Sequence, residues 1–310
     1  MQTAVTNAKG KTTSYSYNSL NDRLASVTAA GKTVAYEYDT VGALKKITAP
    51  GGTVYNFAYD EFGRSTDISV GSQLLSRTQY KNNYSSLVSK FTYGNGAYKE
   101  YTYDNQNRLI AESLNGTQSI KYAYDSRGNT YKITDLLSNV TTQLAYDLIG
   151  RVTGIESSDG QKAAYSYDNL NRIAKSVWKK GDISLSTSYI YGDNAVSGQK
   201  SGLIYGVKLN NVQKLGYTYD ELSRLQTRTV STTTPFVTEY TYLEGGAANT
   251  TTTLVKTVKN GDDVLRYEYD ELGNITSVYE NDVQIESYGY DDLNQLVSAS
   301  YGGQYLYLFV

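Results

Sequence analysis

The sequence of 310 residues contains no cysteine and no histidine. Without these side chains the chain cannot form a disulfide, a thiolate nucleophile, a serine–histidine pair or the usual zinc site. It has no run of 18 apolar residues, and its first residues, MQTAVTNAKGKTTSYSY, lack the apolar core of a signal peptide. Lys and Arg number 29 against 31 Asp and Glu, so no excess of positive charge is available for a phosphate backbone. We therefore expect no nucleic-acid partner and no membrane insertion by this segment.

Proline, tryptophan and phenylalanine are scarce, whereas tyrosine is abundant. The chain has 2 Pro, 1 Trp and 5 Phe, but 33 Tyr and 27 Gly. Hydrophobic residues reach 39% only when tyrosine is counted, so no thick aliphatic core is expected. Tyrosine suits strand surfaces, because its ring is apolar and its hydroxyl can stay in water. The composition favours a β-sheet with much exposed surface.

A short motif, an aromatic residue followed by any residue, Tyr and Asp, recurs along the whole chain. Most copies are about 21 residues apart, and three longer gaps end at Asp104, Asp220 and Asp270. Each of these gaps is close to two periods, so each is expected to contain one degenerate copy. The clear copies are Tyr36–Asp39, Phe57–Asp60, Tyr101–Asp104, Tyr122–Asp125, Tyr165–Asp168, Tyr217–Asp220, Tyr267–Asp270 and Tyr288–Asp291, with the variants Leu144–Asp147 and Tyr15–Asn18.

Each copy is interpreted as a β-hairpin with a defined turn. The aspartate can open a type I turn, and the fourth turn position holds Gly or Asn, which tolerate positive φ; Ser223 is the exception in residue type. Before each turn the side chains alternate over six residues, as in a half-buried strand. We predict that the structural positions of the repeat are the following residues. They are Tyr38, Asp39, Gly42, Tyr59, Asp60, Gly63, Tyr103, Asp104, Arg108, Tyr124, Asp125, Gly128, Tyr146, Asp147, Gly150, Tyr167, Asp168, Tyr219, Asp220, Tyr269, Asp270, Gly273, Tyr290 and Asp291.

The strand after the turn often carries two aliphatic residues three positions apart, such as Leu44 and Ile47. Strict alternation would place them on opposite faces, so a β-bulge or a local twist is expected between them. Loops such as Asn115-Gly116 then lead to the next tyrosine strand. The sequence predicts an all-β fold: residues 1–310 form a single continuous array of tandem hairpins joined into a curved sheet. The first residues fall within a hairpin and the last within a strand, so we expect a fragment of a longer protein.

The run Tyr-x-Tyr-Asp-x-x-Gly-Arg-Leu, seen nearly whole in YTYDNQNRL, LAYDLIGRV, YTYDELSRL and YEYDELGNI, resembles the YD repeats of the Rhs family. This family includes shell proteins of bacterial toxin complexes, wall-associated polymorphic toxins and the animal teneurins. The resemblance covers essentially the whole chain. It implies a sheet that spirals into a hollow shell around a C-terminal toxin polypeptide, in a secreted or cell-surface parent protein.

The resemblance also implies partners, namely the rest of the parent shell and the enclosed toxin polypeptide. The family's self-cleavage core contains Asp-Pro, which this sequence lacks, because Pro50 follows Ala49 and Pro235 follows Thr234. Self-cleavage is therefore not carried over, and we expect a non-catalytic structural scaffold without cofactor or metal.

Two other classes of function remain open from the residues. A repetitive aromatic sheet could bind cell-surface or cell-wall glycans, or a receptor, although such modules favour tryptophan and this chain has only Trp178. Contacts of that kind would fall in the inserted pieces GDNAVSGQKSG and LEGGAANTTTT. A hydrolase could use acidic pairs such as Asp60-Glu61, but these are adjacent and recur on turns, which favours a structural role. The same turns lack the alternating oxygen ligands of a calcium loop.

Overall fold

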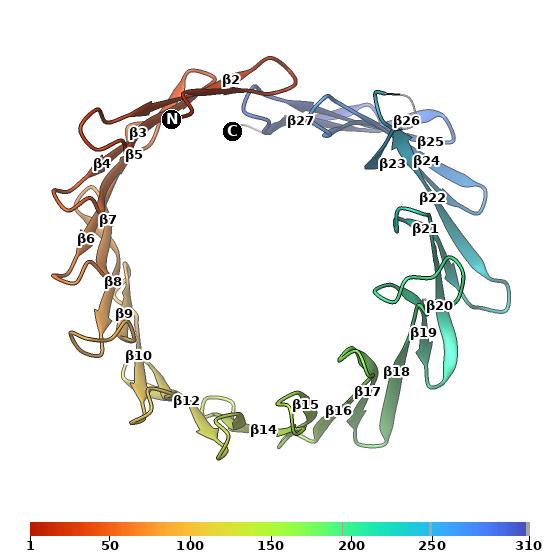
Figure 1. Ribbon diagram of the computed structural model, residues 1–310, viewed down its shortest axis with the longest axis horizontal. Coiled ribbons are helices and arrows are strands. Elements are labelled where there is room, and N and C mark those ends of the chain that lie inside the picture. Colours follow the sequence, from red (N-terminus) through yellow and green to blue (C-terminus); the bar gives the residue numbers. More distant parts are fainter. Residues whose placement is uncertain (194, 248–249, 308–310) are drawn as a thin grey trace. The chain divides into compact units, whose positions relative to one another are not determined.

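The computed structural model describes residues 1–193, 195–247 and 250–307. These residues form 28 β-strands and no helix, and hence no helix that could cross a membrane (Figure 1). The chain divides into two compact units, Met1–Gln161 and Lys162–Val310. The all-β fold of tandem hairpins is thereby confirmed, while the single continuous array over residues 1–310 stays a prediction.

In unit 1 the strands follow one another in chain order along a curved sheet, and each is antiparallel to the next (Figure 1). They are β1 (Ala4–Thr6), β2 (Thr12–Tyr17), β3 (Leu24–Ala29), β4 (Lys32–Tyr38), β5 (Leu44–Thr48), β6 (Val54–Tyr59), β7 (Ser65–Val70), β8 (Gln73–Tyr80), β9 (Val88–Tyr93), β10 (Tyr98–Tyr103), β11 (Leu109–Leu114), β12 (Thr117–Tyr124), β13 (Thr130–Asp135), β14 (Val140–Tyr146) and β15 (Val152–Ser157). The strand β16 (Gln161–Tyr167) contains the boundary between the two units.

Unit 2 repeats the same arrangement, with antiparallel pairing of successive strands from β17 onward. Its strands are β17 (Ile173–Lys180), β18 (Ile183–Tyr191), β19 (Ile204–Leu209), β20 (Val212–Tyr219), β21 (Leu225–Val230), β22 (Phe236–Glu244), β23 (Thr251–Asn260), β24 (Asp263–Tyr269), β25 (Ile275–Glu280), β26 (Val283–Tyr290), β27 (Leu296–Tyr301) and β28 (Gln304–Tyr307).

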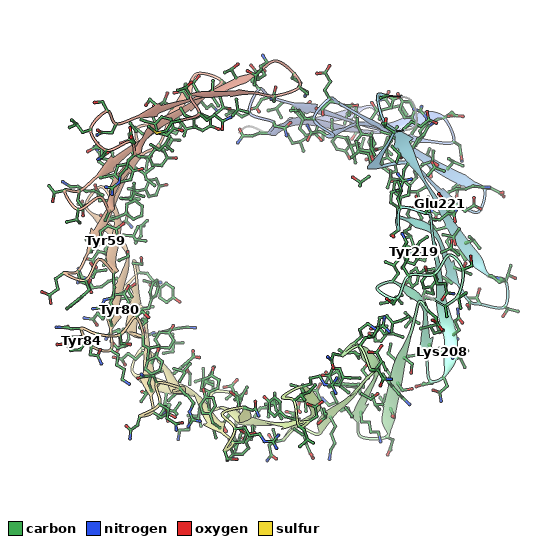
Figure 2. The ribbon with its side chains drawn as sticks, viewed as in Figure 1. Tyr59, Tyr80, Tyr84, Lys208, Tyr219 and Glu221 are labelled. Atoms are coloured by element: carbon green, nitrogen blue, oxygen red, sulfur yellow. The ribbon has the colours of Figure 1, made fainter. Side chains whose placement is uncertain are left out.

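Each sheet is a single layer with almost no fully buried side chain. Among the described residues, only Ala111 and Val278 are buried apolar residues, at 5% and 6% exposure. The tyrosines at the strand ends are half-buried, and aromatic rings gather along the concave side of unit 1 (Figure 2). Stability must therefore come from bonds between neighbouring strands rather than from a central core.

The two edges of each sheet carry different connections, because consecutive strands run in opposite directions. We name the edge with the aspartate turns the turn edge, and the edge with connections such as Asn115-Gly116 the loop edge. The three long insertions in the repeat all lie on turn edges. They connect β8 to β9, β18 to β19 and β22 to β23.

The predicted bulge is confirmed at the start of the strand after each turn. In the hairpin of β4 and β5, Tyr38 pairs with Leu44 but Glu37 pairs with Lys46, so Lys45 is an extra residue. The same shift precedes the closing tyrosine of eleven other hairpins. The bulge places Leu44 opposite Tyr38 and Ile47 opposite Tyr36, so these aliphatic and tyrosine side chains share one face.

The prediction for the inserted piece LEGGAANTTTT is partly wrong. Leu243 and Glu244 still belong to β22, and Thr251–Thr253 already belong to β23. These threonines are β-branched and favour extended backbone, which shortens the loop between the two strands. The loop of GDNAVSGQKSG, in contrast, separates β18 from β19, although its residue 194 lies outside the described residues.

Candidate functional site

The tyrosine that precedes each turn joins its own hairpin to the hairpin before it. The Tyr59 hydroxyl donates to the carbonyl oxygen of Leu44 at 2.8 Å, and Leu44 is the residue that pairs with Tyr38 across the preceding hairpin. The same bond recurs along both units. It is made by Tyr38 to Leu24, Tyr80 to Ser65, Tyr103 to Val88, Tyr124 to Leu109, Tyr146 to Thr130, Tyr191 to Ile173, Tyr219 to Ile204, Tyr242 to Leu225, Tyr269 to Val255 and Tyr290 to Ile275. We call this bond the tyrosine staple; Tyr59, Tyr80 and Tyr219 are labelled in Figure 2.

The staple needs both the tyrosine and the bulge. A bulge interrupts the ladder and leaves backbone groups without a cross-strand partner, which is costly away from water. The carbonyl of the residue beside each bulge accepts the hydroxyl of the next tyrosine instead. One side chain per hairpin therefore completes the backbone hydrogen bonding of its neighbour.

The turn aspartate organises the backbone of its own hairpin. Asp39 Oδ1 accepts the backbone N–H groups of Val41, Gly42 and Ala43 at 3.0, 2.6 and 2.8 Å. Asp39 N–H also donates to the carbonyl of Ala43 at 2.9 Å, which closes the turn. The bond from the third-position N–H to the first-position Oδ1 recurs at Asn18, Asp60, Asp104, Asp125, Asp147, Asp168, Asp220, Asp270 and Asp291.

The fourth turn position has positive φ in every aspartate turn. Gly42 has φ +92° and Gly150 φ +85°. Asn107, Asn171 and Asn294 take φ between +63° and +66°. Ser223 differs from them in residue type but has the same backbone, with φ +69°. A serine in this region is strained, because only Gly, Asn and Asp visit it at low cost.

An arginine at the fifth position binds the second oxygen of the aspartate. The Nε atoms of Arg64, Arg108, Arg151, Arg172 and Arg224 donate to the Oδ2 atoms of the aspartates four residues earlier, at 2.6–2.7 Å. The pKa of the Asp104 carboxyl lies below its usual value because the backbone N–H of Arg108 and the Arg108 side chain both stabilise the anion. At Asp125, the side chain of Asn129 lowers the pKa in the same direction. These carboxylates are thus held ionised as structural acceptors.

Four of these arginines cover the tyrosine ring of the following hairpin. The guanidinium carbon of Arg108 lies 4.5 Å from the ring centroid of Tyr124, and that of Arg172 lies 3.9 Å from the ring of Tyr191. Arg64 and Arg224 lie 4.2 Å from the rings of Tyr80 and Tyr242. Each arginine therefore links its own aspartate to the next tyrosine staple.

The three degenerate copies expected from the long gaps are present in the structure. Tyr80, Tyr191 and Tyr242 make the staple and follow the bulge, although no aspartate comes after them. These three tyrosines are not among the residues predicted for the repeat, because none of them is followed directly by aspartate. The aromatic-x-Tyr pattern of Tyr189–Tyr191 and Tyr240–Tyr242 is the signal that identifies two of them.

In these degenerate copies, arginines of neighbouring hairpins hold the inserted loop or the start of the strand that follows it. Arg64 Nη1 donates to the carbonyl of Asn82 at 2.9 Å and to that of Ser85. Arg172 Nη1 donates to the carbonyl of Ser201, and Arg224 Nη1 donates to that of Thr252 at 2.6 Å. These guanidinium groups take over the positioning that a turn aspartate performs elsewhere.

Lysines of two inserted loops reach forward to the next turn. Lys81 Nζ donates to Asn107 Oδ1 at 2.8 Å. Lys200 Nζ donates to the carbonyl of Glu221 at 2.8 Å and to Ser223 Oγ at 2.6 Å. Each of these loops is therefore fixed to the hairpin on its far side as well.

The Asp125 hairpin has no arginine at the fifth position, and a hollow lies where that side chain would be. Asn129 occupies the fifth position and donates to Asp125 Oδ2 at 3.0 Å. A surface hollow of about 440 Å³ lies there, between the Asp125 and Asp147 turns, with Tyr131 and Tyr146 among its lining residues. Asparagine is too short to cover the Tyr146 ring, so the hollow follows from the residue type at this position.

Two glutamates, Glu112 on β11 and Glu286 on β26, accept short hydrogen bonds that the repeat pattern does not predict. Tyr122 donates to Glu112 Oε1 at 2.6 Å, and Tyr288 donates to Glu286 Oε2 at 2.5 Å. Partial burial and the bond to Glu112 raise the pKa of Tyr122 to about 12. The bond to Glu286 raises the pKa of Tyr288 to about 12 as well.

The acidic pairs considered for catalysis do not converge. In Asp60-Glu61 and Asp220-Glu221, the aspartate binds its own turn and arginine, while Glu61 and Glu221 are exposed. Across the described residues, no group of three or more Asp and Glu side chains is placed to hold a metal ion. The repeated contacts instead connect the backbone, the aspartate carboxylates, the arginine guanidinium groups and the tyrosine rings along the sheet.

Comparison with known proteins identifies the repeat and the fold. A family model named RHS Repeat matches residues 38–71. The chain is similar to the crystal structure of TcdB2-TccC3-TEV, with 16% sequence identity and a TM-score of 0.68, and to that of TcdB2-TccC3-Cdc42, with 16% and 0.69. It is also similar to the Tc holotoxin pore of Photorhabdus luminescens carrying a TccC3 variant, with 14% identity and a TM-score of 0.63. No curated protein matches the sequence.

These likenesses cover 96% of this chain in each case, but only 16–18% of the other chain. The chain thus spans less than a fifth of the length of the structures that it resembles. At these identities the likeness concerns the fold, a sheet of consecutive antiparallel hairpins.

Proposed function

We propose that the chain, which matches the RHS repeat at residues 38–71 and shares the fold of Tc toxin chains, is an Rhs/YD-repeat protein and forms part of a β-shell that surrounds a toxin polypeptide. The parent protein would be secreted or displayed at the cell surface. In this role the chain is a structural scaffold and catalyses no reaction. Its partners would be the remaining shell and the enclosed C-terminal polypeptide.

The observation that carries the proposal is the chain of contacts from one hairpin to the next. In the copies of Asp60, Asp104, Asp168 and Asp220, aspartate, arginine and the following tyrosine form a continuous series, as in Asp104, Arg108 and Tyr124. Such a series strengthens a wall along its length and leaves no carboxylate poised as a general base. The residues predicted for the repeat would thus act in building the wall.

The single-layer sheet also suits a wall better than a globular enzyme. A catalytic site is usually a concave pocket with groups of shifted pKa that face a reacting atom. In this chain, turn aspartates whose pKa is lowered, such as Asp104 and Asp147, face their own turns. We infer that the parent's activity, if it has one, resides outside these residues.

Limited proteolysis of the full-length parent protein tests the proposal. Its C-terminal polypeptide should be digested slowly in the intact protein and rapidly after the shell is opened with denaturant. A matched variant with Tyr59, Tyr124 and Tyr146 replaced by Phe should lose protection at lower denaturant concentration. Equal digestion of the polypeptide inside the intact parent and as an isolated fragment would refute encapsulation.

A further inference from the structure

The hollow between the Asp125 and Asp147 turns lies where other copies of the repeat hold a guanidinium group. In the preceding copy, Nε of Arg108 donates to Asp104 Oδ2 at 2.7 Å, and the guanidinium carbon lies 4.5 Å from the Tyr124 ring centroid. The same two contacts, to the preceding aspartate and to the next tyrosine ring, are made by Arg64, Arg172 and Arg224. The repeat itself thus shows which chemical group this position takes.

Both partners of that group are in place at the Asp125 hairpin. Asp125 Oδ1 accepts the backbone N–H of Asn129 at 2.8 Å, so the carboxylate has the orientation of the standard turn. The Tyr146 hydroxyl donates to the Thr130 carbonyl at 2.7 Å, so the staple holds this ring as it holds that of Tyr124. Among the described residues, Asn129 is the only side chain that donates to Asp125 Oδ2, at 3.0 Å. A carboxylate oxygen has two lone pairs, so Oδ2 can accept a further donor.

The turn that follows leaves the hollow open, because its fourth residue is Gly150. The chain has one other asparagine at the fifth turn position, Asn274, and its Nδ2 donates to Asn294 Oδ1 at 2.6 Å. Asn294 is the fourth residue of its turn, so its side chain reaches back to Asn274. Gly150 has no side chain that could do this, and a Cβ built on it would lie 3.9 Å from Asn129 Oδ1. The space beside Asn129 therefore stays open.

The walls of the hollow suit the stem of an arginine as well as its head. Leu144 and Leu148 line it together with Tyr131 and Tyr146. The methylene groups of a long cationic side chain pack on apolar surface while its charged end meets a polar partner. Arg127 is the one cation among the lining residues, and its Nη1 donates to the Leu148 carbonyl at 3.4 Å. In the part of the chain that the structure describes, no cation lies over the Tyr146 ring.

We propose that this hollow binds the guanidinium group of an arginine side chain from another polypeptide segment. The group would donate to Asp125 Oδ2 and lie over the Tyr146 ring, which combines a charge-assisted hydrogen bond with a cation–π contact. An ammonium group fits less well, because it lacks the plane that stacks on a ring. The site goes beyond the proposed scaffold role and can be tested without an enclosed polypeptide.

Two-dimensional N–H correlation spectra of the isotope-labelled chain test this site. The probe is N-acetyl-arginine amide, which should shift the backbone signals of Gly128, Asn129 and Gly150 along one saturation curve. N-acetyl-citrulline amide replaces the guanidinium group by a neutral urea and should bind at least about tenfold more weakly. N-acetyl-lysine amide keeps the charge without the plane and should also bind more weakly. Ethylguanidinium lacks most of the stem, so it should bind more weakly than the arginine compound.

Three variants change the hollow itself. Asp125→Asn removes the charge and should weaken binding at least about tenfold. It should keep its turn, because Asn18 holds the first position of another turn and accepts the N–H of Leu20 at 2.8 Å. Asn129→Arg places a guanidinium group in the hollow from within the chain and should abolish binding. Arg127→Gln removes a like charge from the rim and should tighten binding.

Arg108→Asn is the matched variant that should create a second site. It empties the equivalent position between Asp104 and Tyr124, and the next turn again has a glycine, Gly128, as its fourth residue. The variant should fold, because Asn129 occupies the same position in the natural chain. It should bind a second probe molecule, with a second saturation curve at the signals of the Asp104 turn. Circular dichroism melts establish that all variants are folded at the temperature of measurement.

Each opposite result overturns the proposal. The site does not exist if the probe leaves the three signals unchanged, or if Asn129→Arg binds it as tightly as the wild type. Equal binding of the citrulline or lysine compound would exclude a guanidinium site, and equal binding of ethylguanidinium would exclude a polypeptide side chain as the specific ligand. Binding that appears only in Arg127→Gln would show that Arg127 fills the hollow in the natural chain. A single site in folded Arg108→Asn would contradict the equivalence of the two copies.

Discussion

Five turn aspartates use both carboxylate oxygens within their own hairpin. Oδ1 accepts backbone N–H groups and Oδ2 accepts an arginine, as at Asp147 with Ile149 and Arg151. Charge-assisted bonds of this kind are stronger than neutral ones. The aspartate therefore determines the turn geometry, and the fourth residue must adapt to it.

Replacement of Gly150 by Val should lower the free energy of unfolding by about 1 to 3 kcal/mol, because a β-branched residue is forced to positive φ. The φ of Gly150 is +85°. Ser166→Val, on the exposed side of β16, is the matched control and should change stability little. Urea denaturation measures both variants. An equal loss of stability would mean that the fourth position is misinterpreted.

Ser223→Gly should raise the free energy of unfolding by about 0.5 to 1 kcal/mol, because it removes a side chain from the left-handed region. The substitution also removes the hydroxyl that Lys200 contacts. Ser223→Ala loses the same hydroxyl but keeps the backbone strain, so it isolates the conformational term. A thermal melt in which the Gly variant is no more stable than the Ala variant would contradict the strain at this position.

Asn129→Arg should stabilise unit 1 by about 0.5 to 1 kcal/mol, through the stacking of a guanidinium on an exposed ring. The new side chain would fill the hollow beside Tyr146 and pair with Asp125, as Arg108 does with Asp104 and Tyr124. Asn129→Lys adds the charge without the planar fork and serves as control. Denaturant midpoints that are equal for both variants would show that stacking contributes nothing.

At the scale of the hairpin, the bulge and the tyrosine staple act together, because the carbonyl beside the bulge is the acceptor of the staple. The step of three between Leu44 and Ile47 predicts the bulge, since only an extra residue brings both to the tyrosine face. The staple could not be predicted in this way, because its acceptor is a backbone carbonyl about 15 residues earlier. Every residue has a backbone carbonyl, so the residue type does not identify the acceptor, whereas the donor is always a tyrosine.

Tyr59→Phe should cost about 1 kcal/mol of stability, because it leaves the Leu44 carbonyl without its hydroxyl donor. Tyr36→Phe is the control, since among the described residues its hydroxyl makes no hydrogen bond. Both substitutions keep the ring and its packing. Hydrogen exchange at the hairpin of β4 and β5 should accelerate only in the first variant, and acceleration in both would point to lost packing instead.

At the scale of a whole unit, each strand contacts only its neighbours in the chain. Proteins of this kind behave as linear arrays, in which stability is a sum of unit and interface terms. Regular spacing, turn chemistry and strand alternation were enough to predict such an array from the sequence. The insertions were harder to place, because threonines of the third one extend β23 rather than form a loop.

Acid should destabilise the units, because the turn aspartates have folded-state pKa values below the ordinary value of 3.8. The stability that they contribute is present above this ordinary value and is lost as pH falls through the lower folded-state values. Denaturant midpoints measured from pH 6 down to pH 2 should fall chiefly below about pH 4. Asp104→Asn combined with Asp147→Asn should flatten this dependence. A midpoint that is constant down to pH 2 would contradict the role of these carboxylates.

The arginine contacts at the degenerate copies have a consequence for how such arrays diversify. Arg64, Arg172 and Arg224 make the usual bonds to their own aspartates. With the same guanidinium, Arg64 and Arg172 bind main-chain carbonyls of a neighbouring insertion, and Arg224 binds one in the strand that follows the insertion, β23. A main-chain carbonyl is present whatever side chain the insertion brings. A hairpin that keeps its arginine can thus bind the main chain of insertions of varied sequence. These three places in the repeat are therefore suited to the insertion of new segments.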